Sequence, residues 1–329
     1  MPELYDVAAI GNAIVDVIAP SSEDFLIDQA LTKGSMMLID EPRAEQLYRD
    51  MAAGIEASGG SAANTMAGVA SLGGRAAYIG KVAADQLGEV FSHDMNAIGV
   101  NFSVPPLTGG LATARCLINV TPDGQRTMST FLGASNQLTA KDVDPKIIEA
   151  SKIIYLEGYL FDPTEAREAF AKAAGLARAS SRLISLTLSD SFVVHRYREL
   201  LLGFIDSEVD ILFANEAELK ALFETEDFDA AMKALRGRAK IAGVTRSEKG
   251  SVVLQGDAIT AISIDPVEKV VDTTGAGDQY AAGFLYGLSQ GRALDACARL
   301  GHLAAGEVIT HYGPRPQVSL KDLAIKAGL

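Results

Sequence analysis

The second half of the sequence alternates between short apolar runs rich in β-branched residues and longer stretches with helical periodicity. The apolar runs occupy residues 152–158, 182–188, 209–215 and 241–246. Helical stretches, such as 164–181, lie between them. Strands that alternate with helices in this way pair in parallel, and helices cover both faces of their sheet. The alternation therefore predicts an α/β fold built on a mostly parallel sheet.

The first half of the sequence departs from this pattern in two β-rich segments. In the second segment, alternating apolar runs flank a turn sequence at 122–124, which favours a β-hairpin. We expect the two segments to pair into one small sheet. That sheet would form a lid over the crevice at the strand ends, where open α/β folds bind ligands. The predicted limits are 1–12, 56–100 and 133–329 for the core and 13–55 and 101–132 for the lid.

The net charge of −13 limits the ligands that this chain could bind. The sequence has no basic stripe of the kind that binds nucleic acids, and an acidic protein repels polyanions. We therefore expect no nucleic-acid partner. Any phosphate-bearing ligand must be held locally by backbone amides, single arginines or a metal ion.

The sequence carries no sign of a membrane or of an oxidising compartment. No apolar run approaches the length that spans a bilayer. The first residues also lack the basic and apolar blocks of a secretion signal. The cysteines are Cys116 and Cys297 alone, so a disulfide framework is not expected. We expect a cytoplasmic protein, and the sequence leaves monomer and homodimer both open.

The stretch "DTTGAGD", residues 272–278, places two glycines and an acid at an expected helix start. Gly275 and Gly277 allow the backbone to approach a ligand closely. If a helix begins at Ala276 or Gly277, its free N–H groups would form an anion site suited to a phosphoryl group. Asp278 would lie beside that group and could accept a proton from an attacking hydroxyl. An ordinary strand–helix turn would explain a few of these residues, but the whole heptad is more specific.

Three motifs together resemble the ribokinase-like (PfkB) family of carbohydrate and nucleoside kinases. They are "DTTGAGD" at 272–278, "GGSAANTMAGVASLGG" at 59–74 and "DILFANEAEL" at 210–219. The resemblance covers essentially the whole chain. It implies an α/β/α core with a mostly parallel sheet and a small β-sheet lid. It also implies ATP with Mg²⁺ as cofactors and transfer of the γ-phosphoryl group to an alcohol.

The same resemblance assigns roles to further residues. Asp278 becomes the catalytic base, and Gly275, Ala276 and Gly277 would form the anion hole. Asn215 with Glu218 would hold Mg²⁺ through water. The alternative for this pair is a helix N-cap and a solvated acid in the first turn. A monovalent cation near Asp272 is left open. The nucleotide-binding positions of the family correspond to Thr245, Arg246, Gly250 and Thr273.

The first strand is followed by polar residues that suit a sugar diol. Asp16 could accept hydrogen bonds from two vicinal hydroxyls, and Asn12 and Asn64 could add others. The backbone of Gly59 and Gly60 could lie against the sugar. Buried hydroxyls need such paired polar groups, because each must be satisfied.

A nucleoside acceptor would also need apolar or aromatic side chains around its base. Candidates for these contacts are Ile14, Met36, Cys116, Phe131, Leu132 and Tyr159. Each of them could equally be ordinary core or lid packing.

Within the family, the chain is most similar to the adenosine kinase branch. The stretches that carry this similarity are 11–17 and 299–313. The similarity places His302 and Ala305 beside the base of ATP and lets Arg126 reach the phosphates. Arg126 could otherwise be an exposed cation at a hairpin tip.

Two departures leave the acceptor open. Glu157 resembles an acid of the sugar kinases, and "TRSEKG" at 245–250 is a variant of the nucleotide loop. We expect adenosine as the phosphoryl acceptor, with ribose, fructose, inosine and guanosine as the alternatives.

Other classes of function fit the sequence less well. No G-x-G-x-x-G turn supports a dinucleotide-dependent oxidoreductase, and no P-loop is present. A catalytically silent nucleoside sensor remains the non-enzyme alternative, although the intact Asp278 favours an enzyme.

Overall fold

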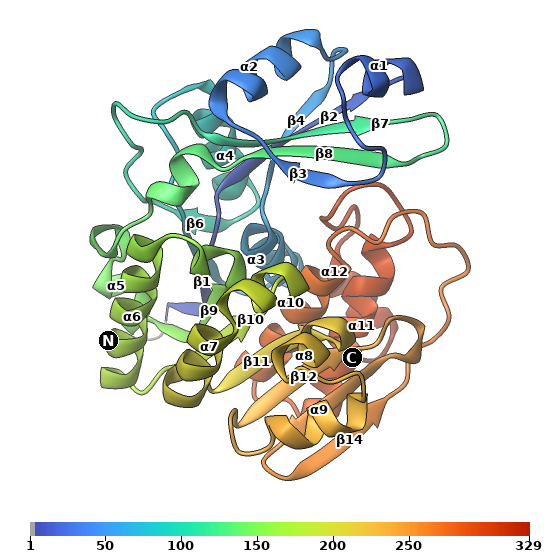
Figure 1. The fold of residues 1–329 in the computed structure, drawn as a ribbon. Coiled ribbons are helices and arrows are strands. Elements are labelled where there is room, and N and C mark those ends of the chain that lie inside the picture. The colour runs from blue at the N-terminus through green and yellow to red at the C-terminus, as the bar shows by residue number, and fades with distance from the viewer. Residues whose placement is uncertain (1–3) are drawn as a thin grey trace.

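Two β-sheets organise the chain in a computed structural model that describes residues 4–329 (Figure 1). Within this range, the larger sheet has nine strands in the order β14-β13-β12-β11-β10-β9-β1-β5-β6, and the smaller has five in the order β3-β8-β7-β2-β4. Residues 1–3, which the prediction placed in the core, lie outside the described residues.

The strands of the larger sheet are β1 Tyr5–Ile10, β5 Ala76–Ile79, β6 Val100–Phe102, β9 Ser151–Glu157, β10 Leu183–Thr187, β11 Ile211–Asn215, β12 Ile241–Thr245, β13 Ser251–Gln255 and β14 Ala258–Ile262. Those of the smaller sheet are β2 Ile14–Pro20, β3 Met36–Leu38, β4 Ile55–Gly59, β7 Ala114–Val120 and β8 Arg126–Phe131.

The α-helices are α1 Glu23–Asp28, α2 Glu41–Asp50, α3 Ser61–Ser71, α4 Gln86–Ala97, α5 Pro145–Glu149, α6 Thr164–Ala179, α7 Ser191–Glu208, α8 Glu216–Leu222, α9 Phe228–Leu235, α10 Ala276–Ser289, α11 Leu294–Val308 and α12 Leu320–Lys326. Short 3₁₀ helices are η1 Gly133–Gln137, η2 Ala140–Asp142, η3 Gly158–Phe161 and η4 Ser247–Lys249.

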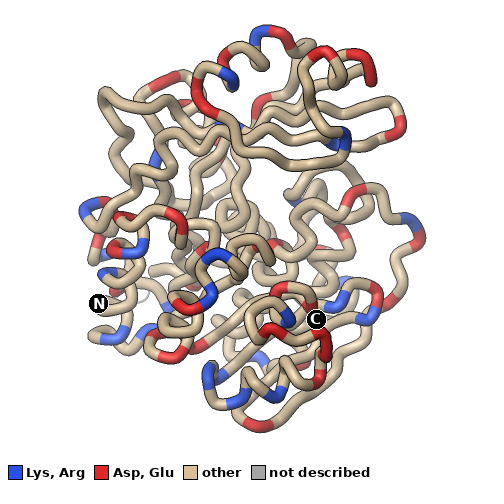
Figure 2. The backbone as a smooth tube through the Cα atoms, in the orientation of Figure 1, with Lys and Arg blue, Asp and Glu red and all other residues tan. Residues whose placement is uncertain are grey.

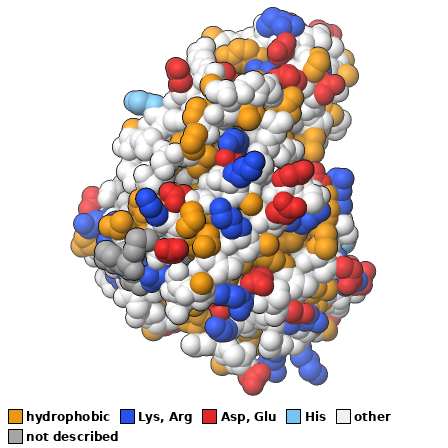
Figure 3. All heavy atoms as spheres, turned by 90° about the vertical axis from the view of Figure 1, so that its left-hand side faces the viewer, with side chains coloured by type: hydrophobic (Ala, Val, Ile, Leu, Met, Phe, Trp, Pro, Cys, Tyr) orange, Lys and Arg blue, Asp and Glu red, His pale blue; other side chains and the backbone are white. Residues whose placement is uncertain are grey.

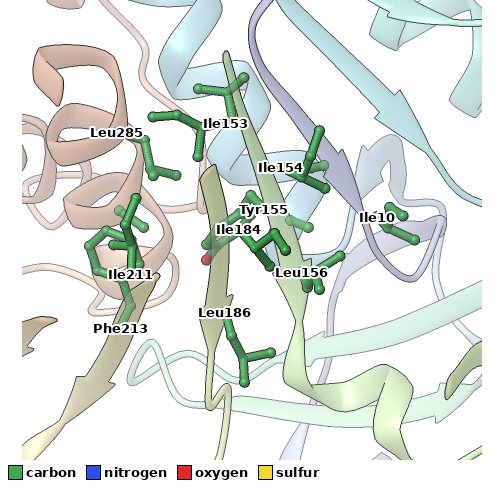
Figure 4. Close-up of a cluster of buried hydrophobic side chains, with 14 of the residues drawn as sticks. Ile10, Ile153, Ile154, Tyr155, Leu156, Ile184, Leu186, Ile211, Phe213 and Leu285 are labelled. Atoms are coloured by element: carbon green, nitrogen blue, oxygen red, sulfur yellow. The ribbon is translucent and has the colours of Figure 1, made fainter. Parts of the chain in front are cut away.

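The larger sheet confirms the predicted α/β core. Its seven neighbouring strands β12, β11, β10, β9, β1, β5 and β6 pair in parallel. Strand β13 runs in the opposite direction and pairs in antiparallel with β12 and β14. Helices α3, α10 and α11 cover one face and α6 to α9 the other (Figure 1). Central strands covered on both faces must be apolar throughout. Figure 4 shows the result, in which side chains of β9, β10 and β11 pack with Leu285 of α10.

The smaller sheet, called the lid here after its predicted role, has different neighbours on its two faces. On one face, Val17 and Leu117 form an apolar cluster with Leu26 of α1 and Leu47 of α2. The other face is turned toward the core (Figure 1). The predicted hairpin is confirmed, because β7 and β8 pair in antiparallel on either side of the turn.

Sheet membership differs from the predicted limits at two strands. Strand β4 pairs with β2 in the lid, although 56–59 had been assigned to the core. Strand β6 pairs with β5 in the larger sheet, although 101 and 102 had been assigned to the lid. Both strands are short, and the turn residues at or just after their ends, Gly59-Gly60 and Pro105-Pro106, do not reveal which sheet a strand joins. The division into two domains stays a prediction.

Charged residues are spread over the outside of the fold. Figure 2 shows Lys and Arg interspersed with Asp and Glu along the outer helices and loops. The face drawn in Figure 3 likewise carries both signs, without a continuous basic stripe. Among residues 4–329, no helix has the length and apolar character needed to cross a membrane.

Candidate active site

Asp278 lies in the first turn of α10, where the sequence predicted the catalytic base. The helix begins at Ala276, directly after Gly275 in the left-handed conformation with φ of +79°. A Cβ on Gly275 would come within 2.6 Å of Pro314, so this position requires glycine. The Ala276 amide, predicted to be free, donates to the Thr273 carbonyl at 3.2 Å, whereas the Gly277 amide has no backbone acceptor among the described residues. The Gly277 amide therefore lies next to the acid and can serve an anion.

Two side chains of α3 hold the Asp278 carboxylate. The Ser61 hydroxyl donates a hydrogen bond to Oδ1 at 2.6 Å, and the Asn64 amide donates one to Oδ2 at 3.2 Å. Burial raises the pKa of Asp278 to about 6, against the opposing effect of these hydrogen bonds and of the nearby Arg315 charge. The group therefore remains mostly ionised at neutral pH and can accept a proton.

Arg315 is a member of this site that the sequence analysis missed. Its Nε donates to the Asn64 Oδ1 at 3.1 Å, and its Nη1 donates to the Ser58 hydroxyl at 2.6 Å. Both polar ends of the Asn64 side chain are therefore engaged, which differs from its predicted role as a free partner for the acceptor. The arginine stands alone in the sequence, with no motif around it that could have identified it.

Glu157 lies beneath the acceptor side of the site, where it supports other groups. Its Oε1 accepts a hydrogen bond from the Asn12 side chain at 2.8 Å, and its Oε2 accepts one from the Ala62 amide at 2.8 Å. The residue is 1 % exposed, and burial raises its pKa to about 7. Asn12 is 2 % exposed, and its Oδ1 has no partner among the described residues. That oxygen is free to accept a hydrogen bond from a ligand hydroxyl.

Asp16 lies on the face of the lid sheet that is turned toward the core. It pairs with Ala57 of β4 and with Cys116 of β7. Gly59 lies so close that a Cβ there would come within 2.6 Å of the Asp16 Cγ. Burial raises the pKa of Asp16 to about 6, and no residue in 4–329 donates a hydrogen bond to its carboxylate. A free acceptor in this place fits the predicted contact with a sugar diol.

The strand register shows which of the predicted apolar contacts share this face. Side chains alternate along a strand, so Ile14 and Cys116 lie on the same side as Asp16. Met36, at the edge strand β3, is 49 % exposed. Phe131 is a correction, because it pairs with Arg115 on the face that α2 covers. The Arg115 guanidinium lies over the rings of both Phe131 and Tyr48 of α2.

Two further candidates for base contacts lie outside the lid strands. Leu132 directly precedes η1 and is partly exposed. Tyr159 lies in η3, where burial and the charges of nearby carboxylates raise the pKa of its phenol. Gly60 caps α3 with a φ of +93° and lies against the Asn12 carbonyl, which fixes the backbone between lid and core.

Asn215 and Glu218 form a reciprocal capping box at the start of α8. The Glu218 amide donates to Asn215 Oδ1 at 2.8 Å, and the Asn215 amide donates to Glu218 Oε2 at 3.0 Å. Glu218 is 6 % exposed, so the alternative of a solvated acid is wrong. Burial raises its pKa to about 7, and the charges of Asp190 and Asp278 add to the effect.

The acidic surroundings of Glu218 fit a hydrated divalent ion. Among residues 4–329, no three His, Cys, Asp or Glu side chains converge on one metal position. Mg²⁺ keeps several waters and needs few direct protein ligands, so a water-mediated contact agrees with this geometry.

Arg126 joins the lid to the core. Its Nη2 lies 2.9 Å from Asp272 Oδ2, and its side chain is 8 % exposed, so it is not an exposed hairpin-tip cation. The guanidinium also lies over the Tyr312 ring. Its Nε and Nη1 are buried without a partner among the described residues. These two donors can serve an anionic ligand.

Two of the predicted nucleotide contacts, Gly250 and His302, lie next to Ser251 at the start of β13. Gly250 has a φ of +82° after η4, where a Cβ would meet the Ile262 carbonyl. His302 of α11 lies 2.9 Å from the Ser251 hydroxyl, and burial lowers its pKa to about 4, so its ring is neutral. Ala305 lies one turn further along α11, and Thr273 is exposed in the loop before α10.

Arg246 already has partners in this part of the fold. Its Nε lies 2.8 Å from Glu216 Oε2, and its guanidinium lies 3.8 Å from the centre of the Phe228 ring. Thr245, the last residue of β12, pairs with Asn215 and Ser251. Thr245 is thus the better placed of the two for contact with a ligand at the strand ends.

Comparison with known proteins agrees with this arrangement. Residues 6–320 match the pfkB family of carbohydrate kinases. The structure superposes on an adenosine kinase from Sinorhizobium meliloti with 54 % identity and a TM-score of 0.91, over 98 % of this chain and 99 % of that one. It superposes on a probable sugar kinase protein from Rhizobium etli with 50 % identity and a TM-score of 0.92, over 100 % and 99 % of the two chains.

A curated relative from Saccharomyces cerevisiae, an adenosine kinase, is 26 % identical over 327 residues, which cover 93 % of this chain and 95 % of the yeast protein. The predicted resemblance is thus confirmed over nearly the whole length. The chain belongs to the pfkB family of carbohydrate kinases.

Proposed function

We propose that this kinase transfers the γ-phosphoryl group of ATP to the 5′-hydroxyl of adenosine, giving AMP and ADP. The observation that carries the proposal is the Asp278 carboxylate, held by Ser61 and Asn64 in the first turn of α10 beside the Gly277 amide. The similarity to the adenosine kinase from Sinorhizobium meliloti supports adenosine as the acceptor.

The chemical step is an in-line displacement at the γ-phosphorus. The 5′-oxygen of adenosine forms the new bond, the bond to the bridging oxygen of ADP breaks, and Asp278 takes the hydroxyl proton. Such transition states are loose, so positioning contributes more than the basicity of the acid. The Gly277 amide, which has no backbone acceptor among the described residues, would stabilise the negative charge on the transferring oxygens without reorganising.

The acceptor would be oriented by polar groups from both sheets. Asp16 would accept hydrogen bonds from the ribose 2′- and 3′-hydroxyls, because no described residue donates to its carboxylate. The free Oδ1 of Asn12 would accept another. Ile14 and Cys116 lie on the same face and would contact the base. Coverage by the lid would exclude water, which otherwise competes as the nucleophile.

The donor phosphates would be held by single groups rather than by a basic surface. Arg126 has two unpartnered buried N–H groups at the junction of lid and core. Asn215 and Glu218 would hold hydrated Mg²⁺, which neutralises charge on the β- and γ-phosphates. Thr245 and Gly250 would contact the nucleotide, and the neutral His302 would lie beside its base.

A screen of acceptors tests this proposal. ADP release from ATP and Mg²⁺ would be measured with adenosine, inosine, guanosine, ribose and fructose, and Asp278→Asn would serve as the inactive control. We expect adenosine to give the highest kcat/KM. A higher value for a free sugar would favour a sugar kinase, in line with the similarity to the Rhizobium etli protein. Adenosine binding without turnover of any acceptor would favour a silent sensor. The cytoplasmic location and the oligomeric state stay predictions.

A further inference from the structure

The segment that follows α11 carries Arg315 into the centre of the site. The Gln279 side chain is fully buried in α10, next to Asp278 in the sequence. Its amide donates to the Pro314 carbonyl at 3.0 Å and to the Asn64 carbonyl at 3.0 Å. This bridge fixes the backbone just before Arg315 against both α10 and α3. The arginine therefore enters the site from a rigid support.

The Arg315 guanidinium connects three elements of the site. Its Nη1 donates to Ser58 of the lid strand β4, and its Nε donates to Asn64 of α3. Its Nη2 lies 3.6 Å from the Met95 sulfur of α4. Because the Asn64 oxygen is occupied by Arg315, the Asn64 N–H group is left to point at Asp278. The amide orientation, and with it the second hydrogen bond to the base, depends on this arginine.

The positive charge of Arg315 also acts on the carboxylates of both Asp16 and Asp278. Its charge opposes the effect of burial on the pKa of Asp16 and on that of Asp278. The other titratable groups that interact with Asp278 come from β2, β9, η3 and α8. They are Asp16, Tyr155, Glu157, Tyr159 and Glu218. Each of these is neutral or negative, so Arg315 is the one positive charge among the described groups that interact with the base.

We propose that Arg315 is a positioning residue for phosphoryl transfer, which orients Asn64 and thereby holds Asp278 in its ionised, correctly directed form. The inference rests on the proposed function, because it assigns Asp278 the role of base. The forked guanidinium suits this task, since it makes two directed hydrogen bonds while its charge acts on the carboxylates. Its contact with Ser58 ties the same group to the lid strand next to Asp16.

The test compares the pH dependence of Arg315→Met, Arg315→Lys and the wild type, with ADP release as the readout. The control is Arg49→Met, which removes a surface arginine whose side chain is 67 % exposed. Because Asp278 must be ionised to act, kcat/KM falls as the pH drops through its pKa. We expect Arg315→Met to move this acid limb to higher pH by about 1 unit. We also expect kcat to fall by about tenfold to a hundredfold, because misplacement of a reacting group by about 1 Å costs that much.

Arg315→Lys keeps the test decisive if the methionine variant does not fold. The lysine retains the positive charge but cannot make the two directed hydrogen bonds of the guanidinium. The acid limb of the pH profile should therefore stay near its wild-type position, while kcat falls. The inference would be overturned if every folded variant had the acid limb and the kcat of the wild type. The proposed function would survive this result, provided that the wild type phosphorylates adenosine. A wild type that phosphorylates no acceptor would instead overturn the proposed function. In Arg315→Met, a lower thermal stability with an unmoved acid limb would indicate a purely structural role and would also overturn the inference.

Discussion

Asp16 is a partly buried acid whose carboxylate accepts no hydrogen bond from the described residues, so its replacement should have opposite effects on stability and on binding. Burial raises its pKa from 3.8 to about 6, with Arg315 and Arg126 lowering it and Asp278 raising it. The folded state therefore binds a proton more tightly than the unfolded state does. The free energy of unfolding therefore falls as the pH rises from about 4 to about 6. Above that range, the full destabilisation caused by the ionised Asp16 is present.

The size of this cost follows from the difference in pKa. A difference of about two pH units corresponds to nearly 3 kcal/mol at neutral pH. The Asp16 side chain is partly exposed, which reduces the figure to on the order of 1–2 kcal/mol. Asp16→Asn has the same size and cannot ionise, so it should raise the melting temperature of the unliganded protein by about 2–4 °C at pH 7. The gain should disappear near pH 4.

The same substitution should weaken the binding of adenosine. The asparagine keeps one acceptor oxygen, and its amide nitrogen meets a hydroxyl that previously donated. Hydrogen bonds to a charged group contribute about 1.5–3 kcal/mol each, and neutral ones about half of that. The net loss of about 3 kcal/mol corresponds to a roughly hundredfold higher Kd.

Differential scanning calorimetry and isothermal titration calorimetry measure the two effects on one preparation. Glu45→Gln is the matched control, because it also removes one negative charge, from a side chain that is 55 % exposed. It should change neither quantity. A variant at Asp16 that binds adenosine as tightly as wild type would refute the assignment to the ribose. A variant that is less stable than wild type at pH 7 would refute the view that this carboxylate is held without a partner.

Four further substitutions test other parts of the site. Asp278→Asn should lower kcat by about 10²–10⁴-fold while adenosine affinity, followed by calorimetry, stays within a few-fold; near-normal turnover would remove Asp278 from the chemistry. Glu157→Gln should lower the free energy of unfolding by about 1–3 kcal/mol, since an NH₂ group would face one of the N–H donors now bound by the carboxylate; urea titration would detect it, and an unchanged midpoint would contradict the supporting role. Arg126→Met should raise the KM for ATP more than that for adenosine in steady-state kinetics, and the reverse order would place the arginine elsewhere. Phe131→Ala should reduce nucleoside and sugar turnover equally, because the ring lies on the face covered by α2; a loss confined to nucleosides would restore its predicted contact with the base.

Local patterns in the sequence predicted the parts of this structure that depend on neighbouring residues. The alternation of strands and helices, the hairpin turn at 122–124 and the glycines before Asp278 each act within a few residues. The capping box at Asn215 is equally local, although it was taken only as the alternative to metal binding. These features needed no knowledge of the partners across the fold.

The missed features all depend on contacts between distant segments. Arg315 meets Ser58 and Asn64 from the far end of the chain, and no spacing rule connects them. The role of Glu157 was left open because it resembles an acid of the sugar kinases, and the structure buries it under α3. Phe131 was assigned to the pocket because it is apolar and lies in the lid. The strand register, which the composition does not determine, turned it to the opposite face.

The short passage from β4 into α3 explains why lid and base should act together. Ser58, at the end of the lid sheet, accepts the Arg315 hydrogen bond, whereas Ser61 and Asn64 hold Asp278. Only Gly60 separates the strand from the helix, and its positive φ lets the Asn12 carbonyl pack against it. A displacement of the lid that moved Ser58 would therefore also shift the Arg315 guanidinium, which orients Asn64. Because of this connection, the acceptor-binding strand and the base cannot move independently, so closure of the lid over a nucleoside would also set the final orientation of Asp278.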